Sequence, residues 1–93
     1  MKNELYCIIV LDKGFVHIGE LHFYVSELGT EWIKIENCYN IRHYGTKEGL
    51  GQLALKGPTS ETILDLFGTV HAPAHSLIFF INTKEELWNL KKI

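Results

Sequence analysis

The sequence has few cysteines, no excess of basic charge and no long hydrophobic run, and each shortage excludes a class of protein. Two cysteines, Cys7 and Cys38, are too few for the disulfide framework of a small secreted domain. Nine basic residues against eleven acidic ones leave a net charge of −2, without the positive face that binding to a DNA or RNA polymer requires. The longest uncharged apolar run beyond the N-terminal segment, residues 77–81, is far too short to span a membrane.

What remains is typical of one small globular domain, residues 1–93. Apolar residues make up 46% of the chain and aromatic residues 12%, which argues against disorder. A domain of this size buries about two-thirds of its unfolded surface, so its core is thin and we expect a homo-oligomer. The N-terminal apolar run lacks the small-residue cleavage site of a signal peptide, so we expect a cytoplasmic protein with its two cysteines as buried thiols.

The hydrophobic pattern predicts a mainly β fold of the α+β type. We expect a small twisted antiparallel sheet, or a partly open barrel, of about six strands with one short inserted helix and a C-terminal helix. Strands are expected over residues 5–11, 15–25, 31–44, 62–67, 69–72 and 76–81.

Two positions inside these strands predict irregularities. Gly19 indicates a bulge or a close crossing of strands. Asn37 either divides the third strand in two or makes a bulge in it. Alternation of apolar and polar residues in that strand places four side chains on one face: Ile33, Ile35, Tyr39 and Ile41.

Two helices follow from capping patterns. Thr46 is the predicted N-cap of a short helix that ends at Gly57-Pro58. Thr83-Lys-Glu-Glu86 is a capping box ahead of Leu87, Trp88 and Leu90, and Lys91-Lys92 suit the negative end of a helix. Trp88 then fastens the terminal helix to the sheet or, alternatively, lies in a dimer interface.

The polar segment from Asn37 to Asp65 is the candidate functional region, because glycines and hydroxyl groups are concentrated there. Arg42 can form a bidentate pair with a phosphate or carboxylate, and Tyr44 offers a ring for stacking. Backbone N–H groups near Thr46 would lie at a helix N-terminus, which attracts anions. We therefore expect a site for a small anionic ligand, built from Arg42, His43, Tyr44, Gly45, Thr46, Gly49, Gly51, Thr59, Ser60 and Thr62. The alternative is a loop that packs on its own sheet, with hydroxyl groups bonded to nearby backbone.

No catalytic motif accompanies this segment. Ser60, His43 and Asp65 are the residue types of a nucleophile triad, but no Gly-x-Ser-x-Gly elbow surrounds the serine. We therefore expect a protein that is not an enzyme and that uses no cofactor, with a small hydrolase based on His43 and Asp65 as an outside alternative.

The histidines do not predict a metal site. His71 and His75 have the spacing of two zinc ligands on a helix, but Pro73 interrupts such a helix. His17 and His22 fall on opposite faces of a regular strand, where we expect surface or half-buried side chains.

One resemblance adds context to the loop. Its motifs are Arg42-His-Tyr-Gly-Thr46, Gly49-Leu-Gly51, Gly57-Pro-Thr59, Thr62-Ile-Leu-Asp65 and Gly68-Thr-Val70. Their order and spacing resemble a family of small, uncharacterised tailed-phage and prophage proteins, in which the aromatic residue before Gly-Thr is often tryptophan. The likeness covers about residues 14–81.

The family has no established activity, so the resemblance implies a source and a context rather than a mechanism. Small non-structural phage proteins often block host defence, and one route is to bind a nucleotide second messenger without cleaving it. The resemblance thus implies sequestration of a cyclic or NAD-derived nucleotide signal in the host cytoplasm. The alternative is a protein–protein interaction module that binds a host or virion protein.

Overall fold

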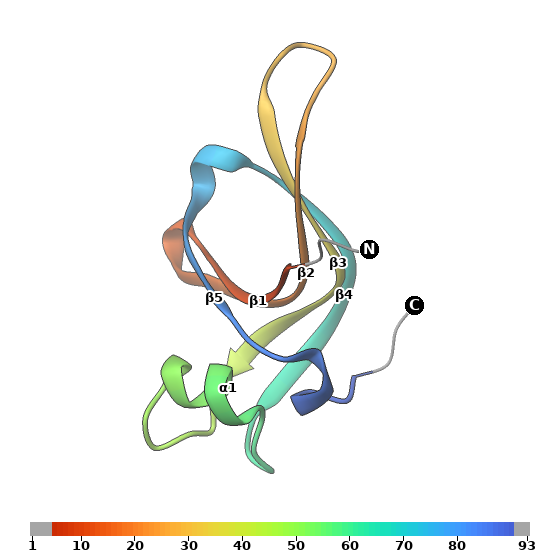
Figure 1. Ribbon diagram of the computed structural model, residues 1–93. Coiled ribbons are helices and arrows are strands. Elements are labelled where there is room, and N and C mark those ends of the chain that lie inside the picture. Colours follow the sequence, from red (N-terminus) through yellow and green to blue (C-terminus); the bar gives the residue numbers. More distant parts are fainter. Residues whose placement is uncertain (1–4, 91–93) are drawn as a thin grey trace.

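The computed structural model describes residues 5–90, which form a five-stranded antiparallel sheet in the spatial order β4-β3-β2-β1-β5. The mainly β prediction is confirmed. The sheet curls around its own inner face, with α1 and its neighbouring loops at one end (Figure 1). The strands are β1 (Leu5–Leu11), β2 (Phe15–Val25), β3 (Glu31–His43), β4 (Ile63–Pro73) and β5 (Leu77–Asn82). The helix is α1 (Leu50–Lys56), and single 3₁₀ turns are η1 (Asp12–Gly14), η2 (Ala74–Ser76) and η3 (Glu85–Leu87).

The curl of the sheet has two local causes in β2 and β3. A Cβ atom at Gly19 would lie 2.7 Å from Ile35 Cγ2 and 2.9 Å from the Glu36 carbonyl oxygen, so only glycine lets the strands approach this closely. The pairing of β2 with β3 shifts register between Ile18 and Glu20, and Asn37 adopts a φ of 51°. Gly19 is thus the predicted close crossing and Asn37 the predicted bulge, and both increase the local bend.

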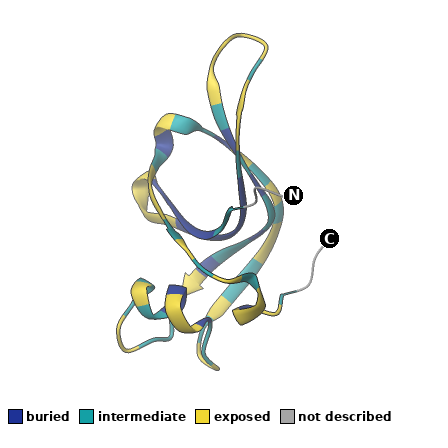
Figure 2. Ribbon diagram, viewed as in Figure 1, coloured by how far each residue is buried: buried dark blue, intermediate teal, exposed yellow. Residues whose placement is uncertain are grey.

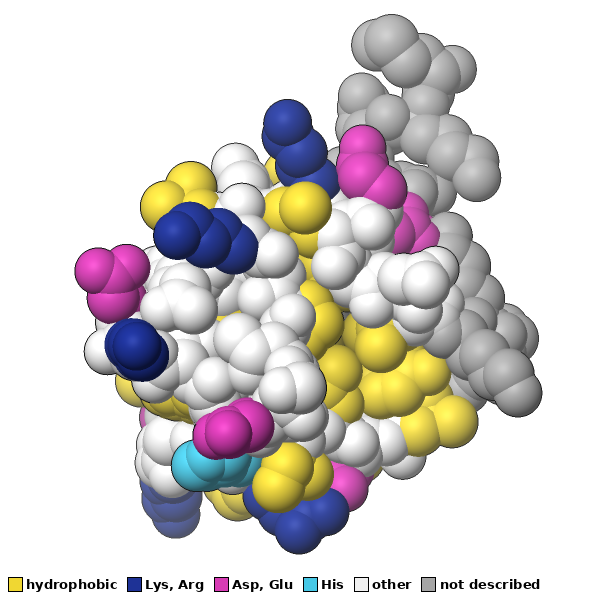
Figure 3. Space-filling view, turned by 90° about the horizontal axis from the view of Figure 1, so that it is seen from below, with side chains coloured by type: hydrophobic (Ala, Val, Ile, Leu, Met, Phe, Trp, Pro, Cys, Tyr) yellow, Lys and Arg dark blue, Asp and Glu magenta, His cyan; other side chains and the backbone are white. Residues whose placement is uncertain are grey.

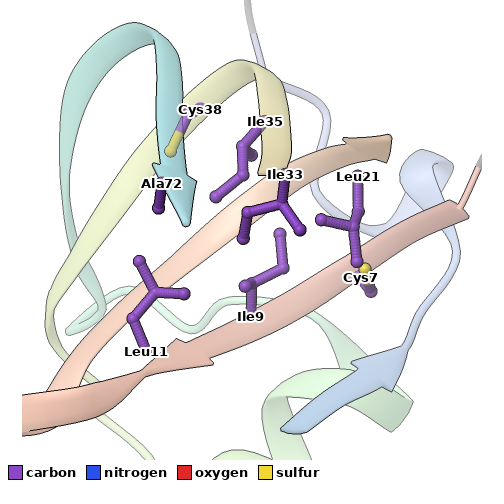
Figure 4. Close-up of a cluster of buried hydrophobic side chains, with 8 residues drawn as sticks. All are labelled: Cys7, Ile9, Leu11, Leu21, Ile33, Ile35, Cys38 and Ala72. Atoms are coloured by element: carbon purple, nitrogen blue, oxygen red, sulfur yellow. The ribbon is translucent and has the colours of Figure 1, made fainter. Parts of the chain in front are cut away.

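The sheet buries apolar side chains on both of its faces, which form an inner and an outer cluster. Figure 4 shows the inner cluster, to which β1, β2, β3 and β4 all contribute. Its members are Cys7, Ile9, Leu11, Leu21, Ile33, Ile35, Cys38 and Ala72. The outer cluster is covered by α1 and by residues 83–90, called the C-terminal segment below. It contains Ile8, Val10, Val16, Ile18, Ile41, Leu53, Ala54 and Trp88. Burial is accordingly concentrated on β1, β2 and the adjoining part of β3 (Figure 2).

The predicted single apolar face of β3 is wrong. Ile33 and Ile35 belong to the inner cluster, whereas Tyr39 and Ile41 pack in the outer one. The bulge at Asn37 adds one residue to the alternation, so every side chain after it points to the opposite face.

The expected six strands become five because Gly68 does not make a turn. It lies within the continuous strand β4, opposite Cys38, with a φ of 92° at a shift in register. Pro73 ends this strand at the edge of the sheet, where a missing N–H donor is tolerated.

The predicted C-terminal helix is also wrong within the described residues, since only the turn η3 forms. The Thr83 hydroxyl donates a hydrogen bond to the Ala54 carbonyl oxygen at 2.6 Å and accepts one from Trp88 Nε1 at 3.1 Å. It therefore fastens the segment to α1 instead of capping a helix. Asn89 adopts a φ of 48°, which leaves the helical path, and Lys91-Lys92 lie outside the described residues. Trp88 still joins this segment to the sheet, since it is 3% exposed in the outer cluster.

Two further expectations concern the cysteines and the membrane. Cys7 and Cys38 are free thiols buried in the inner cluster, as predicted. Among residues 5–90 the single α-helix has seven residues, and none of the described helices has the length and apolar character needed to cross a bilayer.

Candidate functional site

An open pocket of about 820 Å³ lies at the end of the sheet that carries α1 and the loops. That volume falls within the range of small-molecule sites. On this end of the molecule basic and acidic side chains are interspersed, with hydrophobic side chains gathered beside them (Figure 3). The pocket brings together seven of the ten predicted residues: Arg42, His43, Tyr44, Gly45, Thr46, Thr59 and Ser60.

Threonine hydroxyls join the two loops that form the pocket wall. Thr59 Oγ1 donates to the Gly45 carbonyl oxygen at 2.6 Å, and Thr62 Oγ1 donates to the Tyr44 carbonyl oxygen at 2.7 Å. The hydroxyl of Thr62 also accepts a hydrogen bond from the Thr59 backbone N–H at 2.8 Å. Both hydroxyl groups thus already donate their protons to backbone carbonyl oxygens. The structure therefore favours a role for Thr59 and Thr62 in shaping the pocket. Thr62 itself lies outside the lining.

Gly45 is required where the two loops touch. Its φ is 66°, in the left-handed region, and an added Cβ would lie 2.6 Å from the Glu61 carbonyl oxygen and the Thr62 nitrogen. No larger side chain fits this point without separating the loops.

The start of α1 differs from the prediction. Gly49, with a φ of 74°, is the N-cap residue, and Thr46 Oγ1 donates to the Gly49 carbonyl oxygen at 3.0 Å instead of capping the helix. Gly49 and Gly51 are described but do not line the pocket. The expected anion cradle at a helix N-terminus therefore has little support, since α1 is only seven residues long.

Arg42 lies at the pocket in a bidentate ion pair with Asp65. Its Nε and Nη2 donate to Asp65 Oδ2 and Oδ1 at 2.9 and 3.1 Å. Hydrogen bonding to Asp65, and then the charge of Asp65, raises the pKa of Arg42, so the guanidinium stays protonated. Its side chain is 63% exposed, and Nη1 is not used by the ion pair.

The same ion pair bears on the alternative of a hydrolytic triad. Asp65 is engaged by Arg42, and the His43 side chain makes no hydrogen bond with any residue in the range 5–90. No Ser–His–Asp relay is assembled among these side chains.

No known protein family, curated protein or solved structure matches this chain. The candidate site therefore depends on its geometry and chemistry.

Sequence reasoning missed several lining residues. Lys47 and Glu61 are the sequence neighbours of predicted residues in the two loops, and this adjacency could have indicated that they line the pocket. Val16 and Ile41, which add apolar surface, could not be found that way, because only the folded sheet brings them beneath the loops.

Proposed function

We propose that this protein binds a small anionic ligand in the pocket and releases it unchanged. The observation that carries the proposal is Arg42: it is a cation at the pocket, oriented by Asp65 through two hydrogen bonds, with Nη1 left over. An oriented guanidinium loses little side-chain entropy when it binds a phosphate or carboxylate.

The other lining residues suit a ligand that combines an anionic group with a ring. Lys47 adds a second positive charge to that of Arg42, and the negative charges nearby are those of Glu61 in the lining and of Asp65, which pairs with Arg42. Tyr44 supplies an aromatic surface, and Val16 and Ile41 supply apolar contact. A nucleotide has this combination of groups.

Binding without conversion fits the chemistry at hand. A catalytic site needs a base within hydrogen-bond reach of the group it activates. Here Asp65 is engaged by Arg42 and the threonine hydroxyls hold the loops, so His43, which lines the pocket, has no carboxylate partner among the described residues to orient it as a base. The resemblance to small phage and prophage proteins suggests that the ligand is a cyclic or NAD-derived nucleotide signal of host defence, held in the host cytoplasm.

A thermal-melt screen against nucleotides, cyclic oligonucleotides and NAD-derived signals tests this proposal. A ligand at about 100 times its dissociation constant stabilises the fold by about 2.7 kcal/mol, which for a domain of this size raises Tm by about 10–20 °C. We expect such a shift with the ligand recovered intact, weakened at least about tenfold by Arg42→Ala, since a charge-assisted bond is lost.

Lys56→Ala is the matched control, because it removes one positive charge from α1 outside the pocket. Flat melts across the panel, or equal affinity in wild type and Arg42→Ala, would contradict the proposal. Recovery of a converted ligand would show an enzyme instead.

A second candidate function is binding of another protein chain at the edge of the sheet. β5 forms one edge and presents three consecutive exposed apolar residues, Ile78, Phe79 and Phe80. An exposed apolar edge strand is a template for pairing with another strand. The first partner to test is a second copy, with a host or virion protein next. Light scattering should show an oligomer that Phe79→Lys dissociates, and a monomer at all concentrations would count against self-association.

A further inference from the structure

Two glutamates and a histidine converge on the β2–β3 hairpin, at a place that shares no residue with the pocket. Glu20 and His22 are two positions apart on β2, so their side chains share one face of the sheet. Glu36 on β3 is the cross-strand partner of Glu20. One ligand atom from each of the three side chains lies within 4.8 Å of the other two.

The contact between His22 and Glu36 carries the argument. His22 Nε2 lies 2.9 Å from Glu36 Oε1, yet this nitrogen is buried and makes no hydrogen bond with good geometry. His22 Nε2 and Glu36 Oε1 are thus close together, but their relative orientation is not that of a hydrogen bond. Ligand atoms of a tetrahedral zinc ion, each at about 2.1 Å from the metal, are separated by about 3.4 Å. A small rotation of either side chain would bring both atoms to that separation.

The third side chain is held in position by its surroundings. Glu20 is 8% exposed, and Asn37 Nδ2 donates to its Oε2 at 3.4 Å from the bulge in β3. Hydrogen bonds of this kind orient the carboxylate ligands of metal sites. The Asn37 bulge, which bends the sheet, thereby also places a donor beside the cluster.

We propose that His22, Glu20 and Glu36 bind a divalent transition-metal ion of the zinc class. One imidazole nitrogen with two carboxylate oxygens suits Zn²⁺ or Mn²⁺ better than Mg²⁺ or Ca²⁺, which prefer all-oxygen ligand sets. Three protein ligands leave a coordination position for water. Lys34 Nζ, 3.9 Å from Glu36 Oε1, is a competing cation for the same carboxylate.

The test is a titration of tag-free, chelator-treated protein with ZnCl₂ by calorimetry, and with CoCl₂ by visible absorption. We expect one ion per chain, with binding lost in His22→Ala and reduced in Glu36→Gln, which keeps the side-chain volume. Lys34→Met should bind more tightly than wild type, because the competing cation is gone. His75→Ala, at an exposed histidine outside the cluster, is the matched control and should bind as wild type does.

Two results would overturn the proposal. One is the absence of zinc binding by folded wild-type protein. The other is binding that His22→Ala and Glu36→Gln leave unchanged while their circular dichroism matches wild type, since the ion would then occupy another place.

Discussion

Replacing Gly45 by alanine tests whether the two loops of the pocket are locked together as described. Gly45 and Gly29 both have a positive φ, of 66° and 82°. Alanine in this left-handed region costs about 1–2 kcal/mol at either position. Nothing lies within 4 Å of a Cβ added at Gly29, so Gly29→Ala should show that cost alone.

At Gly45 the new methyl group also meets backbone atoms of Glu61 and Thr62 at 2.6 Å. Inserting a methyl group into such a packed contact adds about 1–3 kcal/mol, so Gly45→Ala should lose about 2–5 kcal/mol in total. Its Tm should fall about 5–20 °C further than that of Gly29→Ala. Urea unfolding followed by tryptophan fluorescence measures both variants, and equal losses at the two positions would refute the loop packing.

Three further outcomes are expected. Thr83→Val removes two hydrogen bonds between α1 and the C-terminal segment and should lower the free energy of unfolding by about 2–3 kcal/mol in urea unfolding, whereas Thr83→Ser should lose less. Burial lowers the pKa of His17, so the unfolded chain binds a proton at this imidazole more readily than the folded protein does. The contribution of His17 to the free energy of unfolding should therefore be complete above about pH 6.5 and fall as the pH is lowered below it. His17→Leu should flatten this pH dependence in urea unfolding. Burial raises the pKa of Cys7 and Cys38 to about 12, so both thiols should react with Ellman's reagent only on unfolding.

The strands could be predicted from the sequence because each carries its own apolar pattern. The bounds predicted for β1 and β2 are those observed, and Gly19 and Asn37 are irregular as expected. What failed depends on neighbours distant in the chain. Gly68 became a bulge rather than a turn because β4 pairs with β3 on both sides of it.

The C-terminal helix shows the same limit. A threonine with a glutamate three residues later is a sound local capping pattern, but Ala54 and Trp88 offer the Thr83 hydroxyl other partners. The pocket lies in the region that the sequence singled out, because the glycines and threonines of its loops lie together in sequence. The separate roles of the pocket residues could not be predicted, because their partners lie far away in the sequence. Thr59 and Thr62 donate hydrogen bonds to the backbone of the opposite loop, and Arg42 pairs with Asp65.

The most direct test of the central claim compares the binding of an anionic ligand from the melt screen to wild type, Arg42→Ala and Asp65→Asn by calorimetry. Asparagine at position 65 keeps one oxygen that can orient the guanidinium but removes the negative charge that competes with the ligand, so Asp65→Asn should bind more tightly than wild type and Arg42→Ala more weakly. These opposite changes would identify Arg42 as the residue that holds the anion. Equal affinity in all three proteins would place the ligand elsewhere and contradict the account.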